Sequence, residues 1–109
     1  AGTSADVIVG DGYERFGWKA IRFTAGGERR YDEIALWNAE RRAVVIGDLI
    51  AMAKDGQIDY GPHMFSGIPR SELRPFAERL AELDPRVILS CHLGPREDAA
   101  AILERLRSL

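Results

Sequence analysis

The sequence of 109 residues lacks the features that mark several specialised classes of protein. It has one cysteine, Cys91, which cannot form an internal disulfide, so the fold depends on packing and a reducing compartment is expected. Its net charge is −2, so it lacks the excess of positive charge that is typical of nucleic-acid-binding proteins. No apolar run approaches the roughly 20 residues of a membrane span, and residues 1–10 do not resemble a signal peptide. We therefore expect a cytoplasmic protein with no nucleic-acid or membrane partner.

Apolar residues are well represented, at 46% of the chain, beside 29% charged residues. This composition is ordinary for a globular protein. The length allows one domain, over residues 1–109, with a modest hydrophobic core.

The central pattern of the sequence is a predicted β-hairpin within residues 33–50. Two apolar runs, 34–37 and 43–46, flank a polar segment of the length that hairpin turns use. The second run, Ala-Val-Val-Ile, has no alternating polar residue, which predicts a strand covered on both faces. Gly47 and Asp48 follow directly, so a carboxylate stands just past the strand end, where α/β sheets usually carry their chemistry.

Further strands are predicted on both sides of this hairpin. Residues 6–9 form a β-branched run before a glycine turn, residues 18–24 alternate like a partly exposed strand, and residues 86–90 have the pattern of a short buried strand. Residues 49–53 favour a helical turn. The segment 53–71, interrupted by glycine and proline, is expected to be a long irregular loop.

Two amphipathic helices complete the predicted fold. One begins with Ser71 as its expected N-cap and ends before Asp84 and Pro85. The other spans residues 97–109, and its apolar face consists of Ala99, Ile102, Leu103, Leu106 and Leu109. The order of elements predicts an α/β fold, with a mainly antiparallel sheet and two helices on one face.

A histidine follows the last predicted strand, in the segment Ser-Cys-His-Leu-Gly at 90–94. Together with Ala-Leu-Trp at 35–37 and the strand that ends in Gly47-Asp48, this succession resembles the C-terminal half of a metallo-β-lactamase-fold domain. The resemblance covers residues 7–109 and implies half of an αββα sandwich. In that family, two metal ions, often zinc, activate a water that attacks an ester, thioester, amide or phosphoester.

The resemblance implies that Asp48 and His92 are metal ligands, with zinc, or else iron or manganese, as the cofactor. A carboxylate and a neutral imidazole suit these metals, which lower the pKa of bound water towards about 7. It further implies a metal-dependent, hydrolase-like activity on a small-molecule substrate. No residue is assigned a catalytic role, and no other cofactor site is expected.

The sequence also departs from the family pattern. The H-x-H-x-D-H cluster of the family's first half is absent, and a catalytic zinc ion usually has at least three protein ligands. A further ligand histidine of the family aligns with Gly27, so Glu28, Asp32 or His63 would have to replace it. We therefore expect the chain to be incomplete for catalysis on its own. A complementary N-terminal half, or a second copy in a homodimer, is expected to cover its exposed sheet face.

The same residues allow simpler interpretations. Asp48 is also typical of a turn or helix cap, His92 of a hydrogen-bonded turn, and His63 of an ordinary loop. Cys91 lacks the partners of a nucleophile and is expected to be a buried, inert thiol. The alternative function is a non-catalytic interaction or scaffolding domain that has lost the metal site. A third is a small-molecule sensor that uses the segment 53–71, although no motif there supports it.

Overall fold

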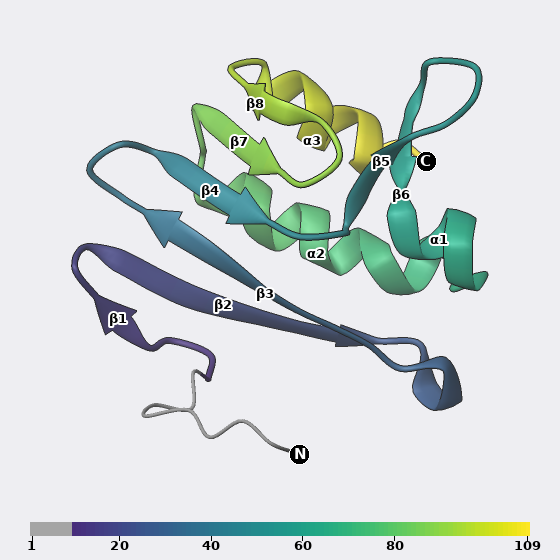
Figure 1. The fold of residues 1–109 in the computed structure, drawn as a ribbon, viewed down its shortest axis with the longest axis horizontal. Coiled ribbons are helices and arrows are strands. Elements are labelled where there is room, and N and C mark those ends of the chain that lie inside the picture. Colours follow the sequence, from purple (N-terminus) through teal and green to yellow (C-terminus); the bar gives the residue numbers. More distant parts are fainter. Residues whose placement is uncertain (1–9) are drawn as a thin grey trace.

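The largest element of the structure is a six-stranded sheet (Figure 1). The computed structural model describes residues 10–109, so the strand expected at residues 6–9 lies outside the described part of the chain. Neighbouring strands are antiparallel except β4 and β7, which are parallel. In sheet order, the strands are β1 (Glu14–Arg15), β2 (Trp18–Ala25), β3 (Tyr31–Asn38), β4 (Ala43–Ile46), β7 (Val87–Ser90) and β8 (Gly94–Arg96). The predicted α/β fold with a mainly antiparallel sheet is confirmed.

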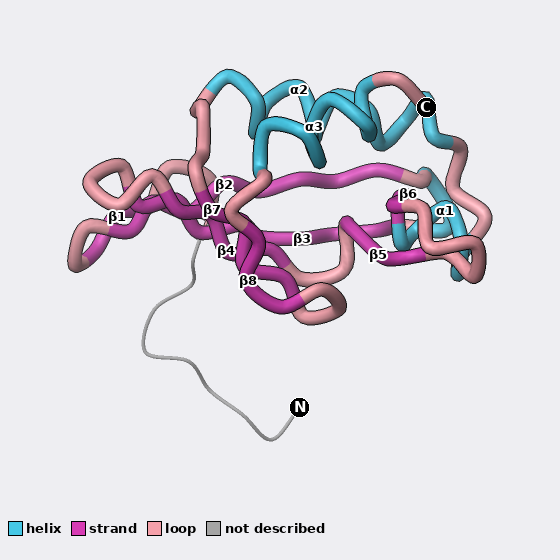
Figure 2. The backbone as a smooth tube through the Cα atoms, turned by 90° about the horizontal axis from the view of Figure 1, so that it is seen from above, coloured by secondary structure: helices cyan, strands magenta, loops and turns pink. Residues whose placement is uncertain are grey.

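The remaining elements lie on one face and at one end of this sheet. They are the 3₁₀ turn η1 (Gly27–Arg29), the strand pair β5 (Ile50–Met52) and β6 (Ile58–Tyr60), and the helices α1 (Gly61–Ser66), α2 (Arg70–Glu82) and α3 (Ala99–Arg107). Figure 2 shows α2 and α3 together over one face, as predicted, and α1 beside β5 and β6. Within residues 10–109, none of the helices has the length and apolar character needed to cross a membrane.

The segment after Asp48 differs from the prediction. The helical turn expected at residues 49–53 is wrong, because Ile50 pairs with Tyr60 and this pairing forms a strand. The long loop expected at 53–71 is also wrong, since it contains β6 and α1. Here proline and glycine mark the two ends of a helix: a proline lies in the first turn of α1, and Gly67 ends the helix with φ 69°.

The start of α2 is a smaller correction. Ser71 is not the N-cap, because the helix begins at Arg70 after Pro69 and has no side-chain cap. The fixed φ of proline favours the extended conformation that precedes the first helical turn. The sequence therefore predicted the start of this helix to within two residues but assigned the wrong cap.

The hydrophobic core lies between the sheet and the two long helices. Phe23 of β2 stacks on Phe76 of α2, with ring centroids 4.4 Å apart. The apolar face predicted for the last helix is confirmed: Ala99, Ile102, Leu103 and Leu106 are buried, and Leu109 is partly buried against the same core. Burial of these periodic apolar faces holds the helices on the sheet.

The opposite face of the sheet carries a row of apolar side chains. Strand register places Leu36 beside Val45, Val45 beside Leu89, and Leu89 beside Pro95. Leu36 is 37% exposed, and no helix of residues 10–109 covers this row (Figure 2). Of the β4 residues on this side, Ala43 is buried and Val45 is half-buried, so the expected cover on both faces of the strand at 43–46 is met only in part within the described chain. We call the row Leu36, Val45, Leu89 and Pro95 the open face.

Tyr60 links the small strand pair to the last helix. Its side chain is fully buried, and its hydroxyl donates a hydrogen bond to the carbonyl oxygen of Leu106 at 2.8 Å. Burial raises the pKa of Tyr60 to about 12. Tyr60→Phe should lower the free energy of unfolding by about 1 kcal/mol at neutral pH, because one buried hydrogen bond is lost.

The difference in unfolding free energy between the wild type and Tyr60→Phe should shrink at alkaline pH. An unfolded tyrosine has a pKa of about 10. Between the unfolded and the folded pKa, Tyr60 ionises in the unfolded wild type but stays protonated in the folded protein. The free energy of unfolding of the wild type therefore falls as pH rises through this range. The phenylalanine variant lacks this loss. Urea unfolding at neutral and alkaline pH, with Tyr13→Phe as a control, measures the gap; a gap that widens with pH would contradict the assignment.

Candidate functional site

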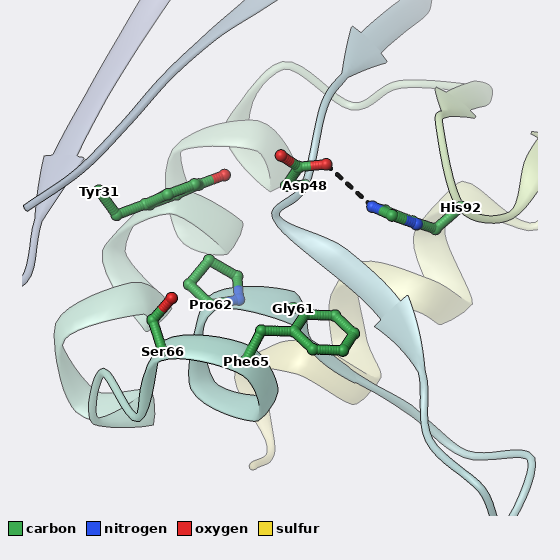
Figure 3. A pocket seen from close by; sticks show the side chains of 7 residues that line it. All are labelled: Tyr31, Asp48, Gly61, Pro62, Phe65, Ser66 and His92. Atoms are coloured by element: carbon green, nitrogen blue, oxygen red, sulfur yellow. Dashed lines mark hydrogen bonds and ion pairs between the residues drawn. The ribbon is translucent and has the colours of Figure 1, made fainter.

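Asp48 and His92 meet at one edge of the sheet. The strands β4 and β7 are parallel, and Ile46 of β4 lies beside Ser90 of β7. Asp48 and His92 each follow this pair by two positions. The Nε2 atom of His92 lies 2.9 Å from Oδ1 of Asp48 (Figure 3). The side chain of Asp48 is 70% exposed and that of His92 is 43% exposed. Both are therefore accessible to a ligand, and the structure brings together the two residues that the sequence singled out.

A pocket of about 270 Å³ adjoins this pair. Its wall comes from the start of β3, from α1 and from the turns after β4 and β7 (Figure 3). The lining residues are Tyr31, Asp48, Gly61, Pro62, Phe65, Ser66 and His92. Asp48 and His92 are thus the titratable groups on the lining most exposed to an incoming molecule, beside a largely apolar surface.

Glu33 holds the backbone that carries Asp48. Its side chain points to the helix-covered side of the sheet, and the residue is only 7% exposed. Its Oε1 atom accepts hydrogen bonds from the backbone N–H of Asp48 at 2.6 Å and of Leu49 at 3.1 Å. A Cβ at Gly47 would lie 3.0 Å from the same oxygen. The glycine therefore lets the buried carboxylate reach the turn and fix it.

The start of α1 constrains the same turn from the other side. Gly61 donates its backbone N–H to the carbonyl oxygen of Leu49 at 2.9 Å. A Cβ at Gly61 would lie 2.1 Å from the backbone oxygen of Asp48, well inside any tolerable contact. The turn at Asp48 is therefore held between a carboxylate and a glycine, both of which lie outside the motif itself.

Tyr31 adds a neutral polar group next to these carboxylates. Its hydroxyl is buried and forms no hydrogen bond of ordinary geometry, as is also true of Oε2 of Glu33. Burial, and then the negative charges of Glu33 and Asp48, raise the pKa of Tyr31. The phenol therefore stays protonated, and it contributes an aromatic ring rather than a charge to the pocket wall.

The residues considered as replacement ligands do not join the pair. Asp32 accepts a hydrogen bond from the Thr24 hydroxyl at 2.6 Å, and Nδ1 of His63 lies 3.1 Å from the carbonyl oxygen of Ile68. Glu28 is exposed in η1, the same turn that contains Gly27. Across residues 10–109, no three His, Cys, Asp or Glu side chains gather closely enough to hold a metal ion. The described chain therefore offers two ligands at this site.

Cys91 is exposed, so the expectation of a buried thiol is wrong. It follows the end of β7, where the chain turns away from the sheet, and it borders a shallow hollow of about 260 Å³ on the open face with Val45, Leu89 and Pro95. Of the apolar residues before it in β7, only Ile88 is buried, and burial does not extend to the turn.

Sequence reasoning missed Glu33, Gly61 and Phe65 as parts of the site. For Glu33 a signal was present: it alternates with Ala35 and Trp37, so a charged residue occupies an inward position of a strand. Gly61 and Phe65 had no such signal, because their roles depend on how α1 packs against the turn.

No family model matches the chain, and neither does any curated protein. The resemblance to a metallo-β-lactamase half-domain, including the αββα sandwich, therefore stays a prediction.

Glu33→Ala should lower the free energy of unfolding by about 2 kcal/mol, because two backbone N–H groups near Asp48 lose their acceptor. Glu33→Gln keeps a side-chain oxygen and should lose less than half as much. Urea unfolding measures both, with Glu40→Ala in the exposed hairpin turn as the control. Equal losses in the alanine and glutamine variants would show that the hydrogen bonds to the turn are not the cause.

Proposed function

We propose that this chain is the C-terminal half of a metal-dependent, hydrolase-like domain, in which Asp48 and His92 supply two ligands to a metal ion. The observation that carries the proposal is the approach of these side chains to 2.9 Å beside a pocket, although they are far apart in the sequence. Their meeting follows from the parallel pairing of β4 and β7 and not from a local motif. Strand ends of this kind are where α/β proteins commonly bind ligands.

The chemistry of the two side chains fits a metal such as zinc. A carboxylate oxygen and an imidazole nitrogen are both common zinc ligands, and both side chains are exposed enough to turn towards an ion. When bound, zinc supplies a water of lowered pKa and polarises a carbonyl or phosphoryl oxygen. Glu33 keeps the Asp48 turn in place through its two backbone hydrogen bonds.

Two ligands are fewer than a catalytic zinc ion needs. We propose that the others come from a complementary half that packs against the open face, in the manner that the family resemblance implies. The open face supports this, because a row of apolar side chains crosses the sheet on its helix-free side. A homodimer that covers the same face is the alternative partner.

The second candidate function is a non-catalytic interaction domain. It is favoured by Gly27, which has no side chain where the family has a ligand, and by the lack of a third ligand within residues 10–109. In this case the open face would bind a partner, and the Asp48–His92 contact would be only a hydrogen bond between two turns. Metal affinity separates the two candidates.

Asp48→Ala and His92→Ala should each weaken zinc binding about tenfold or more, because each removes one ligand of a weak site. Competition with a chromophoric chelator at neutral pH measures the affinity. His63→Ala, which removes the other histidine of the chain, and Asp55→Ala, in the β5–β6 turn, serve as matched controls. Zinc affinity that is unchanged in both site variants would remove the metallohydrolase proposal.

The isolated chain should associate through the open face at concentrations of tens of micromolar, because exposed apolar faces tend to find a partner. Leu36→Glu and Leu89→Glu should shift it towards the monomer. Light scattering measures the mass, and Met52→Glu, which charges an exposed apolar residue of β5, is the control. A wild-type chain that is a stable monomer in this range counts against the proposed partner surface.

A further inference from the structure

The pocket beside Asp48 and His92 has a lining that favours one class of ligand group. Away from that pair, its wall is formed by the ring of Tyr31, by Pro62 and Phe65 of α1, and by small residues. Among residues 10–109, no lysine or arginine side chain lines it. The two titratable groups therefore lie at one part of the rim, and an apolar, partly aromatic surface continues from them (Figure 3).

Phe65 is the unusual member of this lining. It is 74% exposed, whereas a phenylalanine is normally among the more buried residues. It lies on a short helix whose position is set by the contact of Gly61 with the Asp48 turn. The exposed ring is thus held beside the candidate metal ligands by the same packing that fixes Asp48.

The pocket volume sets the size of the group that fits. A cavity of about 150 Å³ accommodates benzene. The present pocket, at about 270 Å³, has room for one aromatic ring with a short substituent, which could reach towards Asp48 and His92. Aromatic rings favour offset or edge-to-face contact with other rings, and Tyr31 and Phe65 both offer such surfaces.

We propose that this pocket binds an uncharged aromatic ring, of the benzyl or phenyl class, and that Phe65 determines the preference for it. The ring packs against Phe65, Pro62 and the ring of Tyr31, while its substituent points to the Asp48–His92 pair. The assignment of this ring to a hydrolase substrate rests on the proposed function. Its binding does not require the metal.

Benzyl alcohol and cyclohexylmethanol are matched probes, since they differ in aromaticity and share the same number of heavy atoms. Titration of the metal-free chain, followed through backbone amide NMR shifts, should show saturable changes at Gly61 and Ser66, with tighter binding of benzyl alcohol. Phe65→Leu should lower the affinity for benzyl alcohol by about two- to tenfold and leave cyclohexylmethanol nearly unchanged. Phe16→Leu, which changes a ring that is 85% exposed and not part of the pocket lining, should alter neither affinity.

Equal affinities of the wild type for the two alcohols, an unchanged preference in Phe65→Leu, or shifts that do not saturate at the pocket would each overturn the proposal. The amide spectrum of Phe65→Leu reports whether that variant remains folded. If zinc binding does not depend on Asp48 and His92 but the aromatic preference is present, the metal proposal fails and the pocket proposal holds. If zinc binding depends on Asp48 and His92 but the aromatic preference is missing, the metal proposal holds and the pocket proposal fails.

Discussion

The parallel pairing of β4 with β7 is the constraint on which the rest of the structure depends. Two parallel strands cannot be joined by a tight turn, so the chain must leave the sheet and return over a long crossover. That crossover contains β5, β6, α1 and α2, and it delivers α2 to the helix-covered face. Since parallel strands end at the same edge, it also places Asp48 and His92 within reach of each other.

The turn at Asp48 shows how much structure a single exposed carboxylate can require. Burial of the Glu33 carboxylate is costly in itself, and its two hydrogen bonds to the turn offset part of that cost. Gly47 and Gly61 provide the close approaches that a side chain would block. The accessible part of the site therefore rests on Glu33 and Gly61, which are buried and belong to no recognisable motif.

Much of the fold could be predicted from the sequence where periodicity extends over enough residues. The alternation along β2, the apolar runs in β3 and β4 and the helical spacing of α2 and α3 predicted these elements, and they were found. Short elements were not, because three-residue strands such as β5 and a six-residue helix such as α1 show no complete period. Their conformation is decided by pairing and packing with distant residues.

The candidate site was predictable in part for the same reason. Asp48 and His92 could be singled out because each follows a strand that the pattern shows. Their mutual contact depends on strand order, and the alternation and apolar runs indicate strands without saying which of them are neighbours. The environment of Glu33, and the exposure of Phe65 and Cys91, depend on tertiary packing that local composition does not encode.

The two outer strands of the large sheet have a consequence for how this protein can associate. In the part of the chain from residue 10 onward, β1 has only two residues, and β8 has three residues that include Pro95, which has no N–H to donate. Short edge strands and proline discourage the addition of a further strand from another molecule. The sheet is thus poorly suited to grow sideways into an extended, fibre-like array. A partner of the kind proposed would therefore contact the face of the sheet, where side chains rather than backbone groups decide which partner fits.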